Sequence, residues 1–138
     1  MVLDVHDLRN DAQVLGCRIE YRNPNNGLWG AYHHDRRLII LKPDLGRIQH
    51  TSVLAHEIAH AYHSHDGWNL KFEAVADKWA AEHLIDYRAL KDIAHRLPSL
   101  SEAAATLDVL PSTLKTYLNH LHPARKAELN RLIAAHAA

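Results

Sequence analysis

The stretch from His56 to His60 reads His-Glu-Ile-Ala-His, and it constrains the fold of this chain more than any other feature. On an α-helix, residues four apart lie on one face, so both imidazoles can reach one metal ion. Glu57 lies about 100° round the same helix, where its carboxylate can contact a metal-bound water without ligating the metal. The pattern therefore predicts a helix that carries two metal ligands and a base, the geometry of a zinc hydrolase.

The flanks of the motif favour this helix over the segment Gln49–His63. Apolar residues recur there at helical spacing, and neither proline nor glycine interrupts them. A second helical run downstream carries the pattern E-x-x-x-D, which places Glu73 and Asp77 on one face. We predict that Glu73 is the third ligand and that Asp77 orients one histidine through its other ring nitrogen.

Asp66 is the competing third ligand, because it follows His56 by ten residues as in the metzincin pattern H-E-x-x-H-x-x-G-x-x-H/D. That pattern uses a glycine to turn the chain, where this sequence has His63. Metzincins also need a methionine turn beneath the metal, and the only methionine here is Met1. The sequence therefore favours Glu73.

The motif from His56 to His60, followed by the run EAVADKWAA from Glu73 to Ala81, resembles the ImmA/IrrE metallopeptidases. Trp79 stands where their second motif has phenylalanine, and Asp86 stands where members commonly have a proline. The resemblance is specific over Leu38–Ile85. It implies a small cytoplasmic zinc endopeptidase of a phage or mobile element, whose substrate is a helix-turn-helix transcriptional repressor.

Three short strands are predicted before the motif. Cys17–Arg22 alternates apolar and charged residues, Leu28–His33 follows a polar turn, and Leu38–Leu41 is apolar on both faces. We expect the last strand to be central or covered by the motif helix, in an α+β fold with a small antiparallel sheet. An exposed edge at Gly27–Tyr32 or Cys17–Tyr21 could hold an extended substrate, and the sequence does not choose between them.

Tyr62, His63 and His65 follow the motif closely and are candidates for the polar group that stabilises an oxyanion. Each of them alone is more often a surface residue than a catalytic group. The short loop after them contains Gly67 as its pivot.

Residues 1–97 are predicted to form a zincin-like metallopeptidase core, and residues 98–138 a helical lobe packed on it. Ser99–Glu102 has the pattern of a capping box, and the residues up to Leu114 favour a three-helix lobe resembling a helix-turn-helix (HTH) domain. From Arg96 to the end, five Lys/Arg oppose three Asp/Glu, which is little positive charge for binding phosphates. We therefore predict that the lobe packs or docks and does not bind DNA.

Composition restricts the setting of this site. Apolar residues make up 47% of the 138 residues and the formal net charge is zero, so no overall field favours nucleic acid or an anionic membrane. Cys17 is the only cysteine, which favours a reducing compartment. Because acidic residues lie near the start and no apolar run is long enough for a membrane span, we expect neither a secretory segment nor a membrane helix. We expect a cytoplasmic protein.

The leading hypothesis is an endopeptidase with one Zn²⁺ per chain, held by His56, His60 and Glu73, and with Glu57 as the base. Manganese or iron would fit the same ligands. Two alternatives stay open: a non-catalytic antirepressor with a structural zinc, and a metal-sensing DNA-binding regulator. The oligomeric state, the cleavage site and the activating signal are not indicated.

Overall fold

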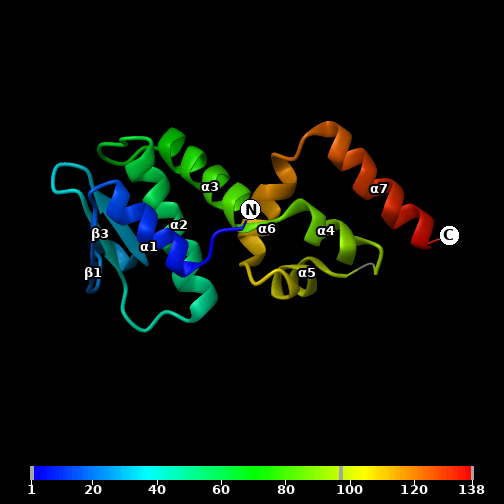
Figure 1. Cartoon of the computed structure of the whole chain (residues 1–138), viewed down its shortest axis with the longest axis horizontal. Helices are drawn as coiled ribbons and strands as arrows, with labels where there is room; N and C mark the ends of the chain where they lie inside the picture. The colour runs from blue at the N-terminus through cyan, green and yellow to red at the C-terminus, as the bar shows by residue number, and fades with distance from the viewer. Residues whose placement is uncertain (1, 97, 138) are drawn as a thin grey trace.

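The computed structural model describes residues 2–96 and 98–137, and within them seven α-helices accompany one three-stranded sheet (Figure 1). The elements in chain order are α1 (Val5–Val14), β1 (Arg18–Tyr21), the 3₁₀ turn η1 (Asn25–Gly27), β2 (Gly30–His33), β3 (Leu38–Leu41), α2 (Arg47–Tyr62), α3 (Leu70–Leu84), α4 (Tyr87–Ala94), α5 (Leu100–Thr106), α6 (Pro111–Asn119) and α7 (Pro123–Ala137). The predicted boundary at residue 97 lies outside the described residues. None of the described helices has the length and apolar character that crossing a membrane requires.

The sheet has the strand order β1-β3-β2 and is mixed, so the prediction of an antiparallel sheet was wrong. β2 pairs antiparallel with β3, with Gly30 opposite Leu41, whereas β1 runs parallel to β3. The physical reason lies in the connections. The short turn between β2 and β3 makes a hairpin, while the longer segment through η1 carries the chain from one edge of the sheet to the other and leaves the middle for β3.

The central position of β3 confirms what its composition predicts. All four of its residues are buried, because the strand is covered on both faces. The motif helix α2 packs against β2 and β3, and α1 and α3 pack against α2 (Figure 1). The sheet therefore serves as the support on which the motif helix rests.

Side-chain caps fix where several helices begin. Asp4 accepts a hydrogen bond from the Asp7 N–H at the start of α1, and Asn69 accepts one from the Phe72 N–H at the start of α3. The capping box predicted at Ser99 forms at the start of α5. Asn69 thereby fixes the first turn of the helix that carries Glu73.

The C-terminal helices join the same hydrophobic core as the sheet and the motif helix. α6 packs against α3 and α5, with Leu114 fully buried and Ala104 inaccessible at the contact. Asp108, in the turn between α5 and α6, adopts a φ of 56° and forms an ion pair with Arg47 of α2 at 3.3 Å. α7 extends away from the sheet (Figure 1). The helix-turn-helix assignment of this lobe stays a prediction.

Candidate metal centre

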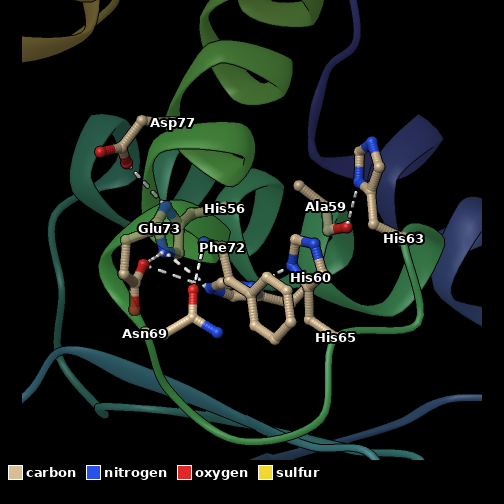
Figure 2. Close-up of polar contacts among 9 residues, drawn as sticks. All are labelled: His56, Ala59, His60, His63, His65, Asn69, Phe72, Glu73 and Asp77. Atoms are coloured by element: carbon tan, nitrogen blue, oxygen red, sulfur yellow. Dashed lines mark hydrogen bonds and ion pairs between the residues drawn. The ribbon is translucent and has the colours of Figure 1, made fainter.

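The two motif histidines lie on the face of α2 that looks toward α3 (Figure 2). Leu54 and Ile58 on the opposite side of the helix are completely buried, which fixes its rotation about its own axis. The Nε2 atoms of His56 and His60 are therefore only 3.1 Å apart, with the two rings nearly perpendicular. The i, i+4 spacing brings the two imidazoles together as predicted.

Glu73, in the first turn of α3, closes the triangle (Figure 2). Its Oε2 atom lies 2.6 Å from His56 Nε2 and 3.2 Å from His60 Nε2. Ligand bonds of ~2.0–2.1 Å at tetrahedral angles would separate neighbouring ligand atoms by about 3.3 Å. The three atoms thus nearly have the spacing of a tetrahedral ligand set, and small side-chain movements suffice for them to bind one divalent cation.

Asp77 lies one turn further along α3 and holds His56 from the other side. Its Oδ1 atom accepts a hydrogen bond from His56 Nδ1 at 2.8 Å, which leaves Nε2 directed at Glu73. Burial opposes a charge on His56, but the Asp77 hydrogen bond and the surrounding carboxylates raise its pKa to about 9. A bound cation would replace the Nε2 proton, because histidine ligates metals in its neutral form.

His65 holds His60 in a similar way, a contact that the sequence did not reveal. Its Nδ1 atom lies 2.9 Å from His60 Nδ1, and its ring stacks on Phe72 at 4.0 Å. The end of α2 explains this placement, since Ser64 adopts a left-handed φ of 55° and the His65 N–H donates to the His60 carbonyl. Glycine usually occupies this left-handed position at a helix end, so the serine gives no signal in the sequence that the helix ends here.

Burial and the nearby positive charge of His56 lower the pKa of His60. Its imidazole is therefore neutral at physiological pH, which is the state that a metal ligand requires. If the His60 Nδ1–H donates to His65, the lone pair of Nε2 is left to face the cluster.

Glu57 is the third member of a group, with His56 and His60, whose ligand-type atoms all lie within 4.8 Å of one another. Its side chain is only 5% exposed, and its Oε2 atom has no hydrogen-bond partner. Burial raises the pKa of this carboxyl to about 7, Glu73 and Asp77 act in the same direction, and His56 opposes them. An unpaired buried carboxylate oxygen beside a ligand cluster is suited to bind and deprotonate a water molecule.

The N-terminal end of β2 approaches the same part of α2. A Cβ atom at Gly30 would lie 2.5 Å from Val53 Cγ1 and 3.2 Å from Glu57 Cγ. Only glycine allows the strand to come this close to the helix. Next to it is a cavity of about 270 Å³, to which both Glu57 and Trp68 contribute.

The other predicted site residues lie elsewhere. His63 Nδ1 forms a hydrogen bond with the Ala59 carbonyl at 2.7 Å (Figure 2). Tyr62 and Trp79 line a separate cavity of about 510 Å³. Asp66 is exposed in the loop between α2 and α3, while among the described carboxylates Glu73 is the one that contacts both motif histidines. An oxyanion role for Tyr62, His63 or His65 stays a prediction.

Sequence reasoning included Trp29 and Gly30 in a possible substrate edge, but it did not place them, or Trp68, beside the metal-site residues. Trp29 and Gly30 precede the motif by more than twenty residues, and no spacing rule links them to it. The one available signal was the isolated glycine at the start of a strand, which often marks a close approach of the backbone.

A motif helix supported by a small sheet, with a buried acid beside paired imidazoles and a carboxylate from the next helix, defines a metallopeptidase. The comparison with protein families matches residues 12–119 to Peptidase_M78, described as IrrE N-terminal-like domain, and the chain belongs to this ImmA/IrrE family. The match runs from α1 through the end of α6. Comparisons with curated proteins and with solved structures gave no match.

Proposed function

We propose that this chain is a cytoplasmic zinc endopeptidase that cleaves one specific protein, a helix-turn-helix transcriptional repressor of a phage or mobile element. His56, His60 and Glu73 would hold the ion, with Asp77 and His65 fixing the two imidazoles. The observation that carries the proposal is the buried, unpaired Oε2 atom of Glu57 beside these three groups. The repressor as substrate rests on the family membership alone.

A bound divalent cation supplies Lewis acidity and lowers the pKa of coordinated water toward neutrality. The residues of the chain provide the proton transfers. Glu57 takes a proton from the attacking water at Oε2 and returns it to the leaving amine; burial, which raises the pKa of this carboxyl, favours its acting as the base. Because the carboxyl is buried, bulk water does not compete for this proton.

The free edge of β2 is the favoured place for an extended substrate. The Trp29 carbonyl accepts a hydrogen bond from the Lys42 N–H, which makes residues 29, 31 and 33 the ones bonded to β3. The backbone groups of Gly30 and Tyr32 therefore face the edge away from β3. A peptide added there would lie beside Glu57, whereas the β1 edge is on the far side of the sheet.

Packing of the C-terminal lobe supports a role other than DNA binding. Thr113, at the start of α6, is buried with its hydroxyl 3.3 Å from that of Ser52 on the motif helix. Ser112 and Thr116 join His56 and Asp77 around a cavity of about 140 Å³. Three polar residues of α6, Ser112, Thr113 and Thr116, thus lie beside the metal centre, so we propose a supporting role for α6.

A purely structural zinc is the main alternative, and the donor set argues against it. Structural zinc sites are closed by four protein ligands, whereas here three donor atoms converge and the fourth nearby group is an unpaired acid. A cation held by His56, His60 and Glu73 would have one coordination position left for water.

The test uses the zinc-loaded full chain and Glu57→Gln, each incubated with candidate helix-turn-helix repressors from the same phage or mobile element. The wild type should cleave the repressor at one site, and Glu57→Gln should bind zinc but leave the repressor intact. Mass spectrometry locates the cut, and metal analysis verifies the zinc content of both proteins. Equal effects of both proteins on the repressor, without cleavage, would establish the antirepressor alternative instead.

A further inference from the structure

We propose that the cleft beside His56 and Glu57 is a subsite that accepts one large apolar side chain next to the scissile bond. This inference rests on the peptidase function proposed above and assigns its substrate preference. The cleft has a volume of about 270 Å³. It is lined by the metal-site residues His56, Glu57 and Glu73 and by the large apolar side chains of Leu28, Trp29 and Trp68, which we call its walls.

The walls are unusual because they are large, apolar and open to solvent. Leu28 is 50% exposed, Trp29 40% and Trp68 69%. They come from two separate segments, one before β2 and one between α2 and α3, and line the same cavity as the Glu57 carboxyl. Apolar side chains that converge on a reactive centre and stay exposed there mark a binding surface.

The chemistry of the lining selects the occupant. The residues that line the cleft, other than the metal-site residues, are aliphatic or carry an indole ring, with one exception. That exception is Ser52, which has a hydroxyl group, and none of them is charged. A charged substrate side chain entering here would lose hydration without gaining a partner. A leucine- or phenylalanine-sized side chain would bury its own apolar surface together with that of the two indoles.

The position of the cleft indicates that the substrate side chain bound there belongs to a residue next to the scissile bond. Two wall residues, Leu28 and Trp29, directly precede Gly30 in the chain. Gly30 is the first residue of β2, and its backbone groups point away from β3, toward the free edge. Successive side chains of an extended peptide point to opposite faces. Of two neighbouring substrate residues beside Glu57, one therefore directs its side chain into the cleft, and this residue flanks the bond that is cleaved.

The first experiment measures binding and does not depend on turnover. The probes are the hydroxamates of leucine, phenylalanine, alanine and aspartate, titrated calorimetrically into the zinc-loaded full chain. The leucine and phenylalanine compounds should bind about 10–100-fold more tightly than the aspartate compound. Trp68→Ala should remove most of this difference, and Trp68→Phe should retain most of it. Leu70→Ala is the matched control, because Leu70 is 75% exposed and does not line the cleft.

Equal affinity for all four hydroxamates, failure of all four to bind, or unchanged discrimination in Trp68→Ala would overturn the subsite. The second experiment uses a tryptic peptide library from a bacterial proteome and reads cleavage sites by mass spectrometry. An apolar residue should dominate one position flanking the cut in the wild type and lose that dominance in Trp68→Ala. Cleavage without such a preference refutes the subsite alone. Absence of any cleavage of both the library and the repressor refutes the peptidase, while the affinity series still decides on the cleft.

Discussion

Replacing Gly30 by alanine tests the close approach of β2 to the motif helix. The added Cβ would lie 2.5 Å from Val53 Cγ1, a distance at which one of the two atoms must move, and 3.2 Å from Glu57 Cγ. Val53 cannot easily rotate away, because β-branched side chains on a helix have one preferred χ1 rotamer. The strand must therefore shift away from α2, together with the substrate edge that it carries.

The magnitude follows from two opposing effects. Overpacking of this kind costs about 1–3 kcal/mol, and replacing a glycine by alanine returns about 0.4–1 kcal/mol through the unfolded chain. The net loss of Gly30→Ala should be about 1–2 kcal/mol. With an unfolding entropy of ~2.1 cal/mol/K per residue over 138 residues, this lowers the Tm by about 3–7 °C.

The assay is thermal and urea unfolding in excess chelator, so that metal binding does not contribute to the measured stability. A double-mutant cycle with Val53→Ala supplies the control, since that variant removes the Cγ1 atom. The Gly30→Ala penalty should fall by at least about 1 kcal/mol in this background, because only the 3.2 Å contact to Glu57 Cγ then remains. A penalty below about 0.5 kcal/mol, or one that Val53→Ala leaves unchanged, would refute the steric argument.

Three further predictions follow from other contacts. Glu73→Ala should abolish zinc binding, and Asp77→Ala should weaken it by about 10–100-fold. Competition with a chromophoric chelator measures both affinities. Equal losses in the two variants would contradict the assignment of Glu73 as a ligand and Asp77 as the residue that orients His56. His65→Ala should weaken zinc binding by about 10-fold through the ligand that it orients, and unchanged affinity would show that the ring contact is incidental. Lys115→Glu should leave repressor cleavage unchanged, because this exposed lysine makes no phosphate contact in a lobe that packs on α3. If the wild type binds duplex DNA in a salt-dependent way and Lys115→Glu abolishes that binding, the lobe is a DNA-binding domain.

The local elements could be read from the sequence because their causes are local. The spacing of His56 and His60 fixes two imidazoles on one helix face whatever surrounds the helix. The all-apolar residues of β3 predict a covered, central strand, and Asp4 and Ser99 mark helix starts through hydrogen bonds that span only three residues. The antiparallel sheet was wrong because strand direction depends on how the connections run and not on the strands themselves.

The sequence by itself thus determined the motif helix, its two imidazoles, the adjacent acid and the family to which the chain belongs. Only the tertiary structure decided which carboxylate meets both histidines, that His65 contacts His60, and that Gly30 and Trp68 border the same cleft. The physical reason is that these contacts join separate elements. Their geometry depends on how α3, the α2 terminus and β2 pack on one core, and helical or strand periodicity carries no information about that packing.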